Sequence, residues 1–287
     1  MAADSSVTEQ IERGAEAARA VLRERRRSRD VSGAPRPGIL VGEGDSWLDY
    51  PGADVLSVLE DDFDWEVQSV AHHGDNLESM AYDADQLVPF RRVFERIQKR
   101  GETPRAILLS GGGNDFAGPE LAMLLDHHGS GHGGINSTIT TELVQRRMRE
   151  AWASLLGFTT QLATDMFQGP IRTVLHGYDY AIPDGRGFLF GPFPGPWLKP
   201  SYERKNLGSS TAAGLRERTQ MTKDLLDQYN GMLASLVEHP DLAHVTYVDL
   251  RGTLTARDYK DVWANELHPT PRGFRTIAAK LHAALIE

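Results

Sequence analysis

The chain has 287 residues, of which 40% are hydrophobic, and this is enough to bury the core of one sizeable α/β domain. Its 31 Lys and Arg residues stand against 40 Asp and Glu residues. The resulting formal net charge of −9 argues against a nucleic-acid partner, because binding to a phosphate backbone depends on clustered cations. Cysteine is absent, so no disulfide bond supports the fold.

The sequence lacks the patterns of a secreted or membrane-spanning protein. Its N-terminal segment contains no apolar stretch followed by a small-residue cleavage site. No run approaches the roughly 20 apolar residues that are needed to cross a bilayer. We therefore expect a cytoplasmic protein without a membrane span.

Residues 1–37 are expected to form a basic helix and a linker. Residues 7–29 are rich in Ala, Glu and Arg, which favour helices, and five arginines lie between Arg23 and Arg29. These arginines form either a solvated helix end, which the helix dipole favours, or a surface for an acidic partner. Residues 31–37 (VSGAPRP) break the helix, so the main domain is expected at 38–287.

Five short apolar runs predict β-strands at residues 38–44, 65–71, 105–111, 171–177 and 244–250. Buried parallel strands have this composition because helices cover both of their faces. Helical patterns are found near residues 53–61, 76–100, 139–167, 211–238 and 271–286. This alternation predicts an α/β fold with a doubly wound, parallel five-stranded sheet, whose ligands bind beyond the carboxyl ends of the strands.

Two long segments interrupt this alternation, one near residues 118–137 and one near residues 180–210. Connections of this length in a compact domain are commonly functional loops. We expect both to be lid-like insertions.

Short polar motifs follow four of the predicted strands. They are residues 44–47 (GDSW), 73–76 (HGDN), 111–115 (GGGND) and 265–269 (NELHP). Taken singly, each could be a helix cap or a turn. Taken together and in this order, at the strand ends where the fold places ligands, they indicate one site.

In these four motifs the sequence resembles the SGNH (GDSL-type) hydrolase family, which is named for a Ser, a Gly, an Asn and a His. The matching residues are Ser46, Gly74, Asn114 and His268, and the resemblance runs from about Gly38 to the C-terminus. It implies the SGNH hydrolase fold, a flavodoxin-like three-layer sandwich, and an esterase that needs no metal or organic cofactor. It does not choose among esterases, lipases, thioesterases, carbohydrate deacetylases and acyltransferases.

The chemistry of acyl transfer requires the same residue types. A serine hydroxyl is a weak nucleophile without a base, and an imidazole with a pKa near its ordinary value of about 6.5 suits this work, so His268 is expected to activate Ser46. The backbone N–H groups of Ser46 and Gly74 and the side-chain amide of Asn114 would form the oxyanion hole. Glycine at position 74 leaves room for the backbone to approach the substrate.

Asn265 stands three residues before His268, where the family has an aspartate. Its amide oxygen can accept the Nδ1–H of an imidazole but supplies no charge. Three arrangements are open: Asn265 or a nearby backbone carbonyl orients the ring, Glu266 acts as the acid, or Asp261 reaches the ring from the preceding turn. We expect a Ser46–His268 dyad held by an uncharged acceptor near Asn265, so that Glu266→Gln and Asp261→Asn each keep most of the turnover.

Aromatic residues are expected to contact the substrate. They are Trp47, beside the nucleophile, and Phe188, Phe190, Phe193 and Trp197, in the second insertion. Gly and Pro separate the last four, which therefore cannot form a regular amphipathic helix. They either cover the active site or patch the domain surface. We expect the former, so that deleting residues 187–196 alters the acyl-chain preference.

The remaining polar residues near these motifs are expected to have structural roles or to be solvated. Asp45 and Asp115 are expected to accept backbone N–H bonds and hold their loops in shape. His127, His128 and His132 lie close together in the sequence, but no carboxylate pattern accompanies them. We expect a solvated loop there and no metal site.

The sequence therefore predicts a serine hydrolase that cleaves a carboxylic ester of a small-molecule substrate through an acyl-enzyme on Ser46. One rival is a catalytically silent binding module of the same fold, which would not react with a fluorophosphonate. A second rival is a metal-dependent phosphoesterase that uses Asp45, Asn114, Asp115 and the histidines, whose activity a chelator would remove.

Overall fold

The structure is a computed structural model, and it describes residues 36–188 and 195–287. The five predicted apolar runs form five parallel strands. These are β1 (Ile39–Glu43), β2 (Glu66–Ser69), β3 (Ala106–Leu109), β6 (Thr173–His176) and β7 (Val245–Val248). They hydrogen-bond in the order β2-β1-β3-β6-β7. The prediction of a doubly wound, parallel five-stranded sheet is confirmed.

Burial follows position in the sheet. β1, β3 and β6 occupy its centre and every one of their residues is buried, whereas the residues of edge strand β2 are half-buried or exposed. The pairing of Val41 with Ile107 gives the register between β1 and the central strand β3. Central parallel strands bury both faces, so their sequences carry continuous apolar runs.

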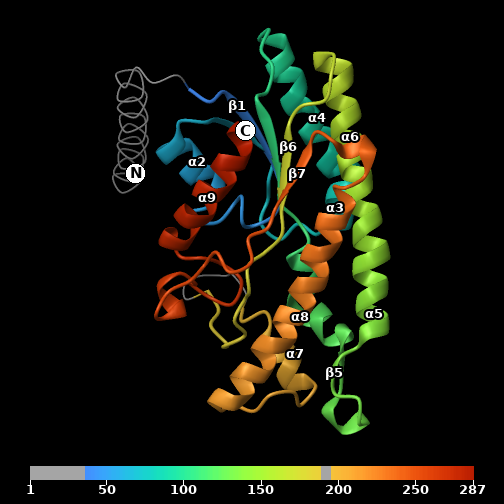
Figure 1. Cartoon of the computed structure of the whole chain (residues 1–287), viewed down its shortest axis with the longest axis vertical. Helices are drawn as coiled ribbons and strands as arrows, with labels where there is room; N and C mark the ends of the chain where they lie inside the picture. Colours follow the sequence, from blue (N-terminus) through green and yellow to red (C-terminus); the bar gives the residue numbers. More distant parts are fainter. Residues whose placement is uncertain (1–35, 189–194) are drawn as a thin grey trace, which may run out of the picture. The chain divides into compact units, whose positions relative to one another are not determined.

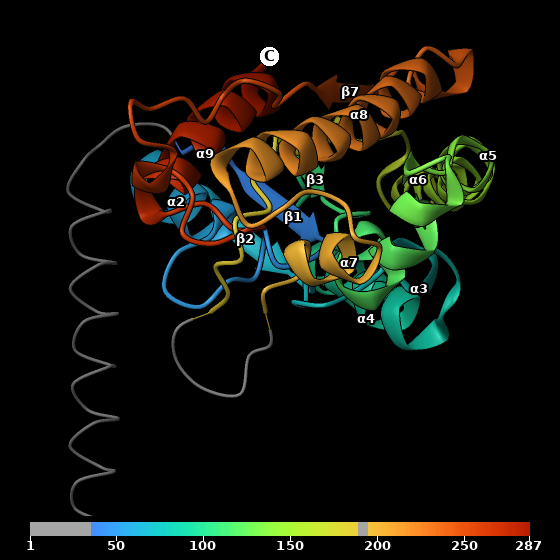
Figure 2. The ribbon, with the colours of Figure 1, turned by 90° about the horizontal axis from the view of Figure 1, so that it is seen from below.

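Helices cover both faces of the sheet, which makes the fold a three-layer sandwich (Figure 1). On one side lie α2 (Val55–Phe63) and α9 (Pro271–Ile286), which pack against each other. On the other side lie α3 (Leu77–Tyr82), α4 (Ala84–Lys99) and α6 (Arg149–Phe167), with α8 (Ala212–Leu236) beside α6. Figure 2 shows the sheet between these two groups.

Two predicted helices are interrupted. The single helix expected over residues 76–100 is divided at Asp83, whose extended backbone ends α3 and begins α4. The helix expected over residues 139–167 begins earlier, as α5 (Ser137–Thr141), and continues through a π-helical segment, η4 (Glu142–Met148), into α6. Helical periodicity alone does not reveal such changes of backbone hydrogen bonding.

The two insertions contain regular structure of their own. The first holds the 3₁₀ segments η2 (Gly118–Leu124) and η3 (His128–Ser130) and a small hairpin of β4 (Leu125–Asp126) and β5 (Gly134–Ile135). The second holds α7 (Lys199–Arg204). Three further 3₁₀ turns are η1 (Asn114–Phe116), η5 (Pro240–Leu242) and η6 (Tyr259–Asp261).

Residues 37–287 form one compact unit. The predicted basic helix at residues 7–29 and most of its linker lie outside the described residues. Among the helices of the described part of the chain, none combines the length and the hydrophobicity that crossing a membrane requires.

Candidate active site

Ser46 and His268, 222 positions apart in the chain, are hydrogen-bonded in the folded domain. The Oγ atom of Ser46 lies 2.8 Å from Nε2 of His268. Ser46 is in the turn that follows β1, and His268 stands just before α9. Thr270 caps that helix, Pro271 begins it, and its Gly273 approaches the backbone of Val262 so closely that a Cβ would lie 2.4 Å from the carbonyl oxygen. The start of α9 therefore sets the position of His268.

The buried carboxylate of Asp45 holds the turn that presents Ser46. Its Oδ1 atom accepts the backbone N–H of Trp47 at 3.1 Å and the hydroxyl of Ser110 at 2.9 Å, and its Oδ2 atom accepts the hydroxyl of Tyr178. A carboxylate that is saturated with donors inside a protein stabilises its loop. This arrangement agrees with the structural role expected for Asp45.

Asn265 occupies the position of the missing aspartate. Its Oδ1 atom lies 3.0 Å from Nδ1 of His268 and also accepts the backbone N–H groups of Leu267 and His268. Its Nδ2 atom donates to the hydroxyl of Tyr50 at 3.0 Å. These partners determine which end of the amide faces the imidazole. Because an amide oxygen only accepts, Nδ1 carries the proton and Nε2 is left to accept the hydroxyl of Ser46.

Two aromatic rings enclose the imidazole of His268. Tyr50 stacks on it with 4.1 Å between ring centroids and 20° between planes, and Trp197 meets it edge-on at 5.4 Å. Burial lowers the pKa of His268 to about 3. At neutral pH the ring is therefore uncharged and able to take a proton.

Glu266 and Asp261, the two acidic alternatives to Asn265, make hydrogen bonds to groups other than the imidazole of His268. The buried carboxylate of Glu266 accepts the backbone N–H groups of Gly185, Trp197, Leu198 and Lys199, at distances between 2.7 and 3.1 Å. It therefore ties together the two ends of the segment that contains residues 186–196. Asp261 is exposed: its backbone N–H donates to Asp258, its backbone oxygen accepts the hydroxyl of Thr270, and its carboxylate has no described hydrogen bond to His268. Sequence reasoning missed the anchoring by Glu266, because its partners are backbone groups about 70 residues away.

The three expected oxyanion-hole residues line one cleft of about 110 Å³ together with His268. The Nδ2 atom of Asn114 donates one N–H to the backbone oxygen of Asp75 at 2.7 Å, which leaves its second N–H for a substrate. Gly74 has φ of 91°, in the left-handed region, and a Cβ there would meet no protein atom within 4 Å. Glycine at position 74 is thus required by backbone conformation, and the space beside it is open.

We expect Asn114→Ala to lower kcat for ester hydrolysis by about 10²- to 10³-fold while KM changes little, because the amide acts on the charge that develops in the transition state. Steady-state kinetics on a chromogenic ester measure the effect. The control is Asn136→Ala, which removes an asparagine of the first insertion that caps α5 and bonds Asp126. A loss for Asn114→Ala that appears only in KM contradicts the oxyanion role.

The aromatic residues that the sequence analysis predicted to contact the substrate differ in their positions. Phe188 and Trp197 line the cleft, and Phe188 packs edge-on against Tyr50 at 5.8 Å. Trp47 is buried, donates from Nε1 to the backbone oxygen of Leu267 and lines a second cavity behind Ser46. Phe190 and Phe193 lie outside the described residues, so the covering role expected for this segment stays a prediction.

Asp115 and His127 accept hydrogen bonds from backbone N–H groups. Asp115 accepts the backbone N–H of Leu77 at the start of α3, and burial raises its pKa to about 6. His127 accepts the backbone N–H of Gly129. Within residues 36–188 and 195–287, no three His, Cys, Asp or Glu side chains are grouped as metal ligands would be.

Sequence reasoning also missed Glu43, the last residue of β1. Its carboxyl group is buried, and neither oxygen has a hydrogen-bond partner in the described part of the chain. Burial, and secondarily the charge of Asp75, raise its pKa to about 9. The signal was visible as an acidic residue at the end of an otherwise apolar central strand.

Because Glu43 is protonated in the folded state but ionises near pH 4.5 when unfolded, its contribution to stability is complete below pH 4.5 and is lost as the pH rises towards 9. We expect Glu43→Gln to flatten the fall in the free energy of unfolding between pH 5 and pH 8 by up to about 1.4 kcal/mol per pH unit. Urea titrations of both proteins measure the two slopes. Equal slopes would show that Glu43 is ionised in the folded protein.

No protein-family model and no curated protein matches the chain. Among solved structures, it is similar to a protein from Slackia heliotrinireducens described as a candidate SGNH hydrolase, with a TM-score of 0.52 and 13% identity over 88% of this chain and 100% of that chain. It is also similar to the lipase Lip_vut3 from a goat rumen metagenome, with a TM-score of 0.50 and 15% identity over 86% of this chain and 96% of that chain. On its strand order, its layers and these two likenesses, the chain has the SGNH hydrolase fold.

Proposed function

We propose that this protein hydrolyses a carboxylic ester through an acyl-enzyme on Ser46. The observation that carries the proposal is the distance of 2.8 Å between the Ser46 hydroxyl oxygen and Nε2 of a buried, uncharged His268. A nucleophile within hydrogen-bond reach of a base, which a third group orients in turn, is the arrangement that activates serine.

Acylation begins when the Oγ atom of Ser46 attacks the ester carbonyl carbon and its proton passes to Nε2 of His268. The carbonyl oxygen becomes negatively charged and is stabilised by the N–H groups of Ser46, Gly74 and Asn114. The tetrahedral intermediate collapses, the bond to the alcohol oxygen breaks, and His268 returns the proton to that oxygen. Water then repeats the sequence on the acyl-enzyme, releasing the acid and restoring the Ser46 hydroxyl.

The imidazolium that forms during the reaction has no carboxylate partner. The Oδ1 atom of Asn265 accepts the Nδ1–H and keeps the ring in the productive tautomer. The face of Tyr50 lies 4.1 Å from the imidazole centroid, within the range in which an aromatic ring attracts a cation. These two neutral groups would perform the work that a triad aspartate performs elsewhere.

Labelling with an alkyl fluorophosphonate, followed by mass spectrometry of the digested protein, tests the proposal. We expect one adduct, located on Ser46, absent from Ser46→Ala and retained in Ser130→Ala, which removes an exposed serine of the first insertion. Ester hydrolysis should disappear with the label. A folded wild-type protein that forms no adduct would instead support a binding module of the same fold. Carbohydrate deacetylases and acyltransferases also form an acyl-enzyme, so labelling does not distinguish them from an esterase. Assays with a panel of acetylated sugars and with alcohol acceptors would then distinguish these activities.

A further inference from the structure

A second cavity adjoins Ser46, and His268 is not among the residues that line it. Its volume is about 50 Å³, and Ser46, Asn114 and Leu267 line both this cavity and the catalytic cleft. His268, Tyr50 and Phe188 line the cleft but not the cavity. Most of the cavity wall is apolar, including Phe116, Leu121, Ala181, Leu198, Leu225 and Leu226. The nucleophile therefore stands at the junction of an aromatic cleft and an apolar cavity.

The direction of proton transfer assigns the two halves of an ester to these two spaces. His268 must give its proton to the leaving alcohol oxygen, so the alcohol has to lie in the cleft that contains the imidazole. The remaining substituent of the acyl carbon then points away from His268. We propose that the cavity behind Ser46 binds the acyl group, and that the substrates are esters of short, uncharged, apolar acids; this assignment rests on the acyl-enzyme at Ser46.

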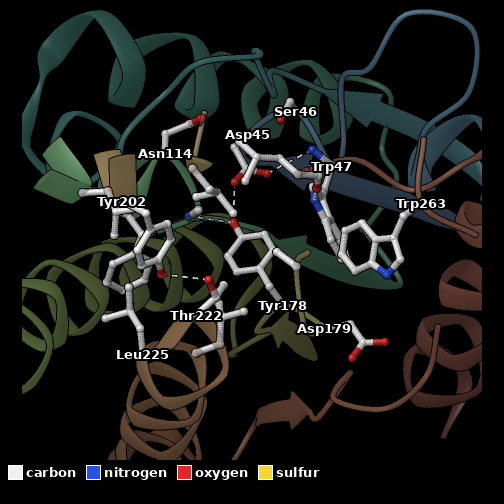
Figure 3. A pocket seen from close by; sticks show the side chains of 17 residues that line it. Asp45, Ser46, Trp47, Asn114, Tyr178, Asp179, Tyr202, Thr222, Leu225 and Trp263 are labelled. Carbon is white, nitrogen blue, oxygen red and sulfur yellow. Dashed lines mark hydrogen bonds between the residues drawn. The ribbon is translucent and has the colours of Figure 1, made fainter. Parts of the chain in front are cut away.

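The size of the cavity limits the acyl group to a few carbon atoms. An apolar cavity of roughly 150 Å³ holds a benzene molecule, so a cavity of about 50 Å³ suits an acyl group of only a few carbon atoms. Tyr202 of α7 and Thr222 of α8 line the cavity and are bonded to each other through their hydroxyls at 2.8 Å. Figure 3 shows this pair and Leu225 on the side of the pocket opposite Ser46. Buried side chains from α7 and α8 thus meet at the end of the cavity.

The charge beside the cavity selects against an acidic acyl group. Asp45 lines the wall, and its carboxylate accepts the hydroxyl of Tyr178, which in turn accepts the backbone N–H of Gly113 (Figure 3). The described contacts place no cationic side chain on this wall. A second carboxylate in the same apolar space would be both desolvated and repelled.

The alcohol side has no comparable size limit. The catalytic cleft shares Gly74, Asn114 and Trp197 with a groove of about 740 Å³, which is also lined by Glu78 and Arg147. A leaving alcohol can therefore extend from the cleft into a wide groove that is lined by both apolar and charged side chains. Acyl length, rather than the size of the alcohol, should decide which esters are hydrolysed.

The test is a series of 4-nitrophenyl esters with acyl chains of two, four, eight and twelve carbons, together with 1-naphthyl acetate. For the wild-type protein we expect kcat/KM to be highest for the acetyl and butyryl esters and at least tenfold lower for the octanoyl ester. The naphthyl and nitrophenyl acetates should both be hydrolysed. Leu225→Ala should raise the octanoyl-to-acetyl ratio of kcat/KM at least tenfold, and Ala181→Leu should lower the butyryl-to-acetyl ratio by a similar factor.

The matched control is Leu236→Ala, which truncates a buried leucine of the same helix that does not line the cavity and should leave both ratios unchanged. Leu121→Ala, from η2, provides an independent enlargement if Leu225→Ala does not fold. Ester hydrolysis whose length preference is unaltered in the cavity variants would overturn the assignment. If no ester is hydrolysed and Ser46 takes no fluorophosphonate, the proposed function itself fails.

Discussion

Replacing His268 by glutamine should lower kcat/KM for ester hydrolysis by about 10⁶-fold, and Ser46→Ala should do the same. Glutamine can still accept a hydrogen bond from Ser46, but it cannot take the hydroxyl proton. Because serine and histidine act as one unit, the double variant should lose no more activity than either single variant. Initial rates of the three variants on 4-nitrophenyl acetate, at high protein concentration, measure this non-additivity.

The control for this pair is His244→Gln. His244 also has its pKa lowered by burial, but it lies just before β7 and bonds Thr160 of α6, away from the cleft. Its replacement should leave the rate of ester hydrolysis within about threefold of the wild-type rate. Substitutions that are remote from a functional site usually have small effects. Losses that multiply in the Ser46 and His268 double variant would show that the two residues act separately.

Removing the acceptor at position 265 should lower kcat by about 10³- to 10⁴-fold, as loss of the correct tautomer does in the trypsin triad. In Asn265→Leu, Nδ1 of His268 loses its acceptor, together with the backbone N–H groups of Leu267 and His268. Asn265→Asp keeps the acceptor and adds a charge, so its activity at pH 8 should equal or exceed that of the wild type. Comparing the two variants separates orientation from charge.

The pH profile identifies the physical effect of the added charge. Burial holds the pKa of His268 at about 3, so wild-type kcat/KM should not fall on the acidic side as far as pH 5. An adjacent carboxylate stabilises the imidazolium, and in Asn265→Asp the acidic limb should move up by about 1 to 3 pH units. Profiles between pH 4 and pH 9, within the range in which circular dichroism shows folded protein, measure the shift. An Asn265→Asp profile that coincides with that of the wild type would mean that His268 does not titrate in catalysis.

Stability restricts the acidic end of this experiment. His268 is uncharged in the folded protein but has an ordinary pKa near 6.5 when unfolded, so its contribution to stability is present above pH 6.5 and is lost as the pH falls towards 3. Protein stability and catalytic protonation therefore change in different pH ranges in the wild type. Between pH 5 and pH 7 the free energy of unfolding should change with pH while the activity stays constant, so the two effects of His268 can be distinguished there.

The amino-acid sequence by itself determined the sheet and indicated the chain positions of the candidate site. The strands and most helices were predictable because buried parallel strands are continuous apolar runs, and because covering helices carry a 3.6-residue period. Ser46, Gly74, Asn114 and His268 could be named because their four motifs resemble those of the SGNH hydrolase family, and because loops at the carboxyl ends of parallel strands meet at one edge of the sheet. The division of the predicted helix at Asp83 was not predictable, since both of its halves have helical patterns.

Tertiary structure alone decided how the site is completed. Tyr50 orients the amide of Asn265 from 215 positions away, and Glu266 binds backbone groups of the second insertion, contacts that no local spacing encodes. The cavity behind Ser46 likewise exists only where side chains of α7 and α8 meet the loops that follow β1 and β3. Local sequence carries periodicity and turn chemistry, whereas which acceptor reaches an imidazole, and how large a space remains beside a nucleophile, depend on the packing of segments that are distant in the chain.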